Sequence, residues 1–326
     1  MSPLSINNVS QRFRDLPTPM AGLALGIGGL GMCIDAAFKF GGRFELLTMT
    51  IVGVLLLSLC IRFAMHYETL KADLKHPVIG SVAPTFAMAL MVFSHGVHYF
   101  LPAFGTAIWM TAILLHVFFL VKFIRYRRRD FSLHHMVPSW FVPPVGIAVA
   151  AVAWAGQPSD WTFLPAWLCM AFALACYVVM MPLMFYRLMF RQTIPEGAQP
   201  TIAILAAPAS LTLAAYLNVA INPSPLIVIV MLGLAMTMTL IVYGAFIHLL
   251  RLPFSPGYAA FTFPMAIGAT ALYKVEAIFV QWKLPADLIH QVDVLGRIEL
   301  GIATAVICYV AVRYTLYFVA RFRQAE

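Results

Sequence analysis

The sequence predicts an all-α integral membrane protein whose ten transmembrane helices form five parallel helical hairpins with pseudo-fivefold symmetry around a central pore. Three observations lead to this fold class. The 326 residues are 62% hydrophobic and only 10% charged, with a mean hydropathy of +0.88. The chain divides into ten apolar segments. Prolines that open every second segment recur with a period of about 60 residues, and such a period indicates repeated units.

The composition leaves no room for a soluble domain, because soluble domains carry about 25% charged residues. We therefore expect residues 1–326 to form a single transmembrane domain. The five cysteines lie in apolar runs without a CxxC pair, so the sequence predicts neither a metal site nor a disulfide framework. The net charge of +8 does not indicate nucleic-acid binding, because basic loops that set membrane topology account for it.

The chain begins with a polar stretch, residues 1–15, which lacks the pattern of a signal peptide and is interpreted as a cytoplasmic tail. Residues 321–326 are interpreted as a second short tail. About 20 apolar residues cross a membrane, and a crossing segment must be helical to bond its own backbone groups. The expected helices span residues 16–37, 45–65, 78–100, 103–125, 138–156, 161–186, 200–221, 224–250, 256–280 and 294–320.

The positions of Lys and Arg predict the orientation of these helices. Most of the 21 Lys and Arg residues lie in the tails, in the loops that lead from even-numbered to odd-numbered helices, or at the adjoining helix ends. Because cytoplasmic loops are enriched in Lys and Arg, both termini are predicted to be cytoplasmic, with the protein in the inner (plasma) membrane. All odd-numbered helices then run outward in parallel.

The odd-numbered helices share a proline pattern and a small-residue composition. Each opens at a proline, and the openers Pro17, Pro77, Pro138, Pro200 and Pro256 are separated by 60, 61, 62 and 56 residues. A second, inner proline follows in four helices, at Pro84, Pro144, Pro208 and Pro264, and Ala24 takes this place in the first. The even-numbered helices are bulky and aliphatic. Because small residues permit close contacts or leave open space, we expect five inner helices around an axis; a solid bundle is the alternative.

The residues just before the inner-proline positions define a candidate constriction: Leu23, Ala83, Pro143, Ala207 and Phe263. Under fivefold symmetry their side chains face the axis at one depth. Phe263 carries the one aromatic ring of this set and would plug a narrow tube, about 10 Å deep at ~1.5 Å per residue. Hydrophobic constrictions gate channels by excluding water. The alternative is an ordinary core phenylalanine, since the chain contains 25.

Polar residues in the expected lining favour anions over cations. The odd-numbered helices contain no acidic residue before Asp35 and Glu276 at their outer ends, and a cation path would be expected to carry one. Lys274 and Arg297 are candidates for an outer vestibule that attracts anions. Anchoring of these residues and Glu299 at the membrane interface is the alternative. The other polar groups of the lining are the hydroxyls of Thr18, Ser81, Thr85, Ser94, Ser139, Thr201, Ser210, Thr212 and Thr262.

Five stretches carry a resemblance to a known family: PTPMAGLALGIGG (17–29), HPVIGSVAPTF (76–86), VPSWFVPPVGIA (137–148), QPTIAILAAPASLTLAAY (199–216) and FTFPMAIGATALYK (261–274). They resemble the tellurite-resistance/dicarboxylate-transporter family, which contains bacterial TehA and the plant slow-type anion channels. The resemblance runs nearly end to end. It implies a homotrimer whose subunits each have a pore lined by five inner helices, with an aromatic plug at Phe263. Ala24 departs from the proline that relatives often have there.

The resemblance also implies conduction of small monovalent anions such as chloride and nitrate. Our first hypothesis is therefore a gated anion channel occluded by Phe263. The alternative is a secondary carrier or exporter of C4-dicarboxylates, sulfite or tellurite-type oxyanions, because some family members move malate or sulfite. A carrier of this kind needs a titratable or cationic site in mid-membrane, and the odd-numbered helices offer none. We expect no enzymatic activity and no cofactor, because the sequence shows no plausible nucleophile or metal cluster.

Overall fold

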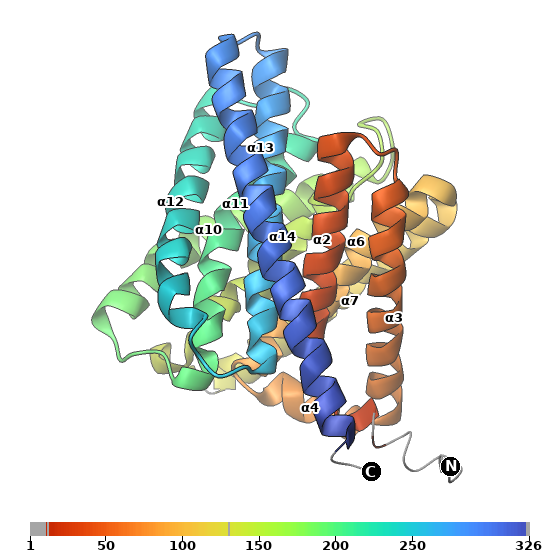
Figure 1. Ribbon diagram of the computed structural model, residues 1–326, viewed down its shortest axis with the longest axis vertical. Helices are drawn as coiled ribbons and strands as arrows, with labels where there is room; N and C mark the ends of the chain where they lie inside the picture. Colours follow the sequence, from red (N-terminus) through yellow and green to blue (C-terminus); the bar gives the residue numbers. More distant parts are fainter. Residues whose placement is uncertain (1–10, 12, 130, 324–326) are drawn as a thin grey trace.

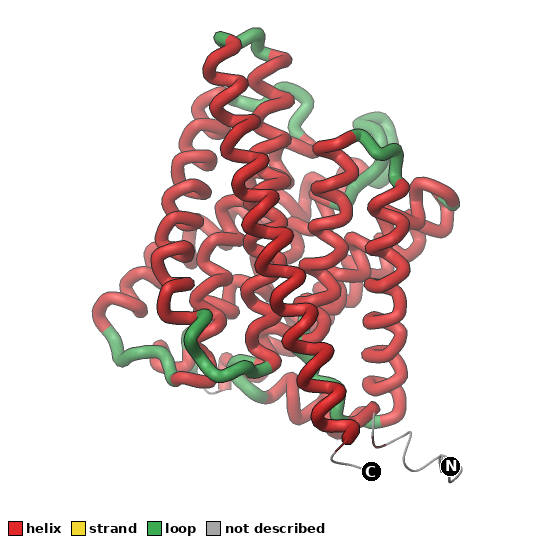
Figure 2. Tube along the Cα trace, in the orientation of Figure 1, coloured by secondary structure: helices red, strands yellow, loops and turns green. Residues whose placement is uncertain are grey.

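The computed structural model describes residues 11, 13–129 and 131–323, and this part of the chain is helical and contains no strand (Figures 1 and 2). The predicted N-terminal tail, residues 1–15, lies mostly outside the described residues, as does the end of the C-terminal tail, residues 324–326. All ten predicted segments are helical. The fold class predicted from apolar segments is therefore confirmed as a helical membrane protein.

Nine of the described segments are long and apolar enough to cross a membrane. Their helices are α2 (Met20–Phe38), α3 (Arg43–Met65), α6 (Thr85–Phe100), α7 (Pro102–Arg129), α10 (Phe163–Phe190), α11 (Ala207–Val219), α12 (Pro225–Leu249), α13 (Thr262–Gln281) and α14 (Ala286–Arg323). The fifth segment, Pro138–Val152, is shorter. It alternates between 3₁₀ and α conformations, as η2 (Pro138–Phe141), α8 (Val142–Val145), η3 (Gly146–Ala148) and α9 (Val149–Val152). The adjacent prolines at 143 and 144 lack N–H donors and prevent a regular helix there.

The inner prolines mark helix starts, which differs from the kinks within continuous helices that the sequence suggested. Pro84 is the N-cap of α6 and follows the short helix α5 (Ile79–Val82). Pro208 lies in the first turn of α11, after the 3₁₀ helix η4 (Glu196–Ala206). Pro264 likewise follows η5 (Pro256–Phe261), as the third residue of α13. Proline suits the first turn of an α-helix because the N–H groups there have no intrahelical partner. Ala24 lies inside the uninterrupted helix α2.

Two further differences concern the outer segments. A short helix, α4 (Tyr67–Lys75), fills the connection between α3 and α5, where no helix was predicted. The last helix begins at Ala286, eight residues before the predicted start at position 294. Consequently α13 and α14 form a long hairpin that extends beyond the neighbouring helices at the top of Figure 1.

Burial separates the odd-numbered segments from the even-numbered ones. In the four long odd-numbered spans, between 61% and 78% of the residues in the most apolar stretch are buried inside the bundle. In the even-numbered spans the share is 28% to 39%. The odd-numbered segments also contact one another in a closed ring: α2 touches α6 and α13, α11 touches α13 and α9, and α9 touches α6. We call these five segments the inner ring. Fivefold symmetry of the ring stays a prediction.

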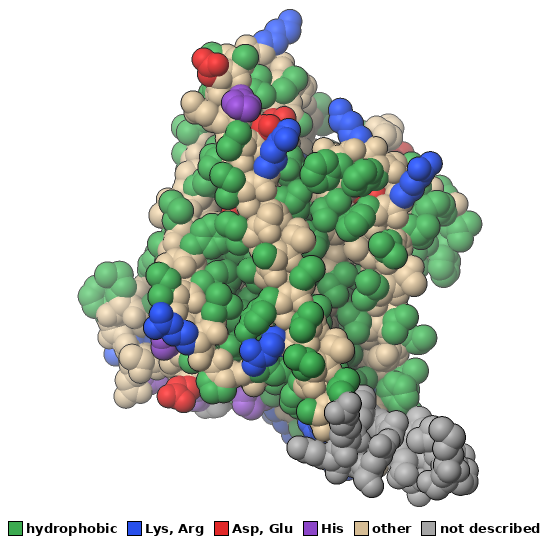
Figure 3. All heavy atoms as spheres, in the orientation of Figure 1, with side chains coloured by type: hydrophobic (Ala, Val, Ile, Leu, Met, Phe, Trp, Pro, Cys, Tyr) green, Lys and Arg blue, Asp and Glu red, His purple; other side chains and the backbone are tan. Residues whose placement is uncertain are grey.

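The even-numbered helices cover the inner ring. Each packs against two neighbouring segments of the ring; α3, for example, packs against α2 and α6, and α14 against α13 and α2. Their outward side chains are large and apolar, including Leu57, Leu114, Val179, Leu226 and Ile247. On the face drawn in Figure 3, charged side chains gather toward the two ends and a broad hydrophobic band lies between them. Such a band suits the hydrocarbon core of a bilayer.

The two ends of the described chain meet on one face of the bundle. The guanidinium of Arg321, near the end of α14, lies 3.1 Å from the carboxylate of Asp15, shortly before α2. We call this side of the molecule the terminal face. It is the lower end of the bundle in Figure 1, where α2 begins and α14 ends.

Candidate functional site

A cavity of about 330 Å³ lies inside the inner ring, on the side of the terminal face. All five odd-numbered segments contribute to its wall, and each does so through its N-terminal part. The contributing stretches fall within residues 17–25, 78–88, 141–146, 197–211 and 255–264. The N-terminal parts of five segments that are distant in the sequence therefore surround one space.

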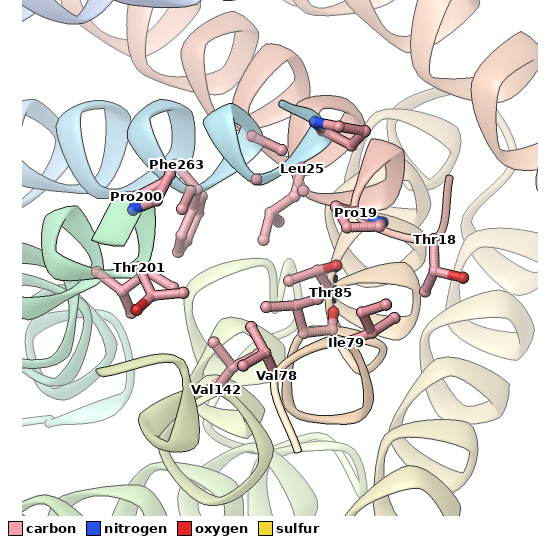
Figure 4. Close-up of a pocket in the computed structure, with 18 of the residues that line it drawn as sticks. Thr18, Pro19, Leu25, Val78, Ile79, Thr85, Val142, Pro200, Thr201 and Phe263 are labelled. Atoms are coloured by element: carbon pink, nitrogen blue, oxygen red, sulfur yellow. Dashed lines mark hydrogen bonds between the residues drawn. The ribbon is translucent and has the colours of Figure 1, made fainter. Parts of the chain in front are cut away.

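Phe263 is one of the residues that line this cavity and is 7% exposed. In Figure 4 its ring points toward the space between Leu25, Val142 and Thr201. A Cβ atom added at Gly29 of α2 would lie 3.4 Å from the Cδ2 atom of this ring, so the ring packs closely against α2. Because η5 rises about 2.0 Å per residue, the ring lies ~13 Å beyond Pro256, deeper than an α-helix would place it.

The cavity wall is mostly apolar. Of the hydroxyl groups expected from the sequence, those of Thr18, Thr85 and Thr201 line it. Thr85 donates to the carbonyl of Val82 and Thr201 to that of Ala198, both at 2.6 Å. Other expected hydroxyls instead join neighbouring segments, as Ser81 and Ser139 do at 2.6 Å. The hydroxyl-lined tube expected from the sequence is therefore a largely hydrophobic chamber.

Two charged residues line the cavity among the residues that the structure describes, Arg62 of α3 and Asp73 of α4, and they form an ion pair. Arg62 donates a hydrogen bond from Nη2 to the Asp73 carboxylate, with an N···O distance of 2.8 Å. It donates a second from Nη1 to the hydroxyl oxygen of Thr18, at 2.6 Å. The Thr18 hydroxyl in turn donates to Asp73 at 2.7 Å. Sequence reasoning missed this group, because Arg62 lies on an outer helix and was counted only among the topology-setting cations.

A second polar group joins three inner segments near the end of the ring opposite the terminal face. Lys274 of α13 donates from Nζ to the Asn218 side-chain oxygen at 2.6 Å. The Asn218 amide, close to the end of α11, donates to the carbonyls of Ala151 and Trp154 at 2.8 and 3.1 Å. Lys274 therefore lies level with the ends of α9 and α11. Arg297 lies apart from it, 67% exposed on α14 and paired with Asp293 at 2.9 Å.

Comparison with protein families decides the identity of the fold. The model of the family described as voltage-dependent anion channel, SLAC1, matches residues 16–315. The chain belongs to the SLAC1 family. This confirms the family resemblance seen in the sequence motifs, and it makes the chain an anion transporter or channel in a membrane setting.

Two curated SLAC1 relatives come from Methanocaldococcus jannaschii, and both are described as uncharacterized transporters. One is 26% identical over 251 residues, which cover 69% of this chain and 72% of the relative. The other is 26% identical over 254 residues, with the same shares covered. Their descriptions agree with transport as the general activity of the family.

In this SLAC1 chain the predicted constriction residues and the inner-proline positions that follow them, all expected to line the pore, fall into two groups. Four of them line the cavity, namely Ala207, Pro208, Phe263 and Pro264. The first three segments instead present residues one position away, such as Gly22, Leu25, Val82, Thr85, Val142 and Val145. The remaining predicted positions, Leu23, Ala24, Ala83, Pro84, Pro143 and Pro144, are not in the described lining. The last two segments enter the wall through the 3₁₀ runs η4 and η5, whose three residues per turn give the side chains a different register from that of an α-helix.

The structure places Glu299 inside the membrane-spanning bundle, which corrects its predicted position near the outer boundary. Because α14 begins at Ala286, Glu299 lies about 20 Å along the helix. It is 5% exposed, accepts a hydrogen bond from the hydroxyl of Tyr243, and has no partner for Oε1 among the described residues. The Oε1 atom of Glu299 packs against Gly268 of α13. A Cβ atom added at Gly268 would lie only 2.6 Å from this oxygen, so the space that Glu299 occupies depends on the glycine. A neutral carboxylic acid fits this site, because a buried carboxylate without a cation is costly.

Proposed function

We propose that this SLAC1 family member is a gated channel for small monovalent anions such as chloride and nitrate, and that the ring of Phe263 closes its path. The observation that carries the proposal is a chamber enclosed by all five inner segments, into which the aromatic ring of Phe263 points. A hydrophobic constriction stops ions because it does not replace their water. The apolar wall offers few donors, so selectivity among anions is expected to be loose and to follow the ease of dehydration.

The proposal is tested by reversal potentials of the purified protein in planar bilayers. With unequal concentrations of chloride or nitrate salts, the reversal potential should follow the anion gradient and remain unchanged when sodium replaces potassium. Mixed anion salts then give the order of permeation. A reversal potential that follows the cation gradient, or saturable anion exchange without net current, contradicts the proposal of an anion channel.

A carrier for organic acids, sulfite or tellurite-type oxyanions is a second candidate, and Glu299 is the observation that favours it. A carrier driven by protons needs a titratable group in mid-membrane, and Glu299 lies beside Thr239 near the middle of α12. Glu299→Gln keeps the shape and the neutral state, so we expect normal folding and unchanged anion current in a channel. In a proton-coupled carrier, the same variant should abolish uptake driven by a pH gradient, measured in proteoliposomes.

Lys274 is proposed as the cation of the vestibule at the mouth opposite the terminal face. Lys274→Met removes a positive charge beside the ends of α9 and α11 and should lower anion current about threefold or more, since one charge at 5–10 Å is worth roughly 1 kcal/mol. Single-channel conductance at low ionic strength is the measurement, because salt screens the effect. Lys283→Met, at the exposed tip between α13 and α14, is the matched control and should leave conductance unchanged.

We further propose a homotrimer in the inner membrane with cytoplasmic termini. The family resemblance supports the trimer, and the distribution of Lys and Arg supports the orientation. The terminal face, with the cavity mouth, would then face the cytoplasm. Native mass spectrometry of the detergent complex and labelling of a cysteine placed at Gln11 test these two statements.

A further inference from the structure

Among the charged residues that the structure describes, Arg62 and Asp73 are the two that line the cavity. Arg62 belongs to α3, a helix whose other side chains mostly face outward, yet its own side chain is 5% exposed and reaches the cavity wall. Asp73 reaches the same wall from α4 with 16% of its side chain exposed. In Figure 4, Thr18 lies to one side of the chamber, apart from Phe263. The pair therefore lies at the rim of an otherwise apolar chamber.

The chemistry of this group matches a small anion. A guanidinium is permanently charged, weakly hydrated and planar, and it can donate several hydrogen bonds to one ligand. At this rim the Asp73 carboxylate and the Thr18 hydroxyl occupy part of that donor set. Asp73 is therefore an anion already bound to Arg62. An entering anion would meet the one cation of the described lining with its counter-ion beside it.

We propose that Arg62, together with Thr18, forms a binding site for a small monovalent anion at the terminal-face mouth, and that Asp73 keeps its affinity low. This inference rests on the proposed channel function. Conduction requires a site that attracts an ion yet releases it, and an internal carboxylate that competes for the guanidinium meets this requirement. The anion exchanges with Asp73 at the guanidinium and then moves toward Phe263.

The experiment changes the balance of charge at the rim. Asp73→Asn leaves Arg62 without its counter-ion, so the anion concentration that half-saturates the current from the terminal face should fall about three- to tenfold. Arg62→Gln should raise it by a similar factor, and Arg62→Lys should restore most of the wild-type value. The matched control is Glu68→Gln, which removes an exposed carboxylate from the same helix, α4, and should leave the value unchanged.

A purely structural ion pair gives a different result. If Asp73 and Arg62 only tie α3 to α4, their variants lower the yield of folded protein while the half-saturating concentration stays at the wild-type value, and this outcome overturns the proposal. If Asp73→Asn does not fold, equal half-saturating concentrations in Arg62→Gln and Arg62→Lys overturn it as well.

Binding can also be measured without transport. Chloride or nitrate should raise the Tm of the purified protein more in Asp73→Asn than in wild type, and least in Arg62→Gln, because a ligand stabilises the state that binds it. Absence of anion current in both the wild type and Phe263→Ala would contradict the proposed channel, whereas the thermal shift still tests whether the anion binds at Arg62. A shift that is equal in all variants overturns the site alone.

Discussion

Phe263→Ala is expected to raise the anion current of this protein about tenfold or more at a given voltage. The substitution removes the ring that points into the chamber and leaves a methyl group among Leu25, Val142 and Thr201. A barrier lower by about 1.4 kcal/mol passes ions about tenfold faster, and a fully occluding ring should exceed this barrier. Current at fixed expression in oocytes, or efflux from liposomes, is the measurement.

The controls separate opening from loss of structure. Phe279→Ala truncates a phenylalanine of the same helix that is similarly buried but outside the cavity wall, so it should not increase current. Phe263→Leu should give an intermediate current, because leucine fills part of the same space. A well-folded Phe263→Ala protein with wild-type current would remove Phe263 as the gate and leave it an ordinary core residue.

Gly26→Ala is expected to cost about 1–3 kcal/mol of stability, because it overpacks a close helix contact. A Cβ atom at Gly26 would lie 2.4 Å from both Cβ and Oγ1 of Thr262 and 3.2 Å from the backbone nitrogen of Phe263. The hydroxyl of Thr262 is itself bonded to the carbonyl of Gly22 at 3.0 Å, so the threonine is fixed against α2. We expect a lower Tm in detergent and a displaced start of α13, and therefore altered gating.

A second glycine provides the comparison. Gly233 of α12 has no atom within 4 Å of an added Cβ, so Gly233→Ala should be neutral or should stabilise the helix by about 0.5–1 kcal/mol. The double variant Gly26→Ala with Thr262→Gly exchanges the small residue across the contact and should recover part of the lost stability. Equal Tm values for the Gly26→Ala and Gly233→Ala proteins would show that α2 and α13 are not packed closely here.

The features that the sequence predicts well are local. The length of apolar runs and the contrast between small-residue and aliphatic segments fix the ten helical segments and separate the inner ones from the outer ones. The length of an apolar run and its composition are properties of consecutive residues and of the membrane around them. They can therefore be read without knowing which distant residues are in contact. The same holds for the family motifs, which contain Phe263 and Pro264.

The charged rim and the intramembrane acid could not be predicted in this way. Arg62 and Thr18 are joined by a hydrogen bond across 44 residues of sequence, and no periodicity marks either one. Glu299 was misplaced because the apolar pattern does not show that α14 starts at Ala286. Which side chains face the cavity depends on the 3₁₀ runs. The proline pattern predicts where these runs end, but it does not predict that they have three residues per turn.

The arrangement of the cavity wall also has an electrostatic consequence. The N-terminal parts of all five inner segments surround the chamber, and a helix carries roughly half a positive charge at its N-terminus from its aligned peptide dipoles. The formal charges of Arg62 and Asp73 cancel, so the dipoles leave a net positive potential in a space with few polar side chains. The direction in which the backbone runs therefore contributes to a preference for negative ions, in addition to the contribution of any single side chain.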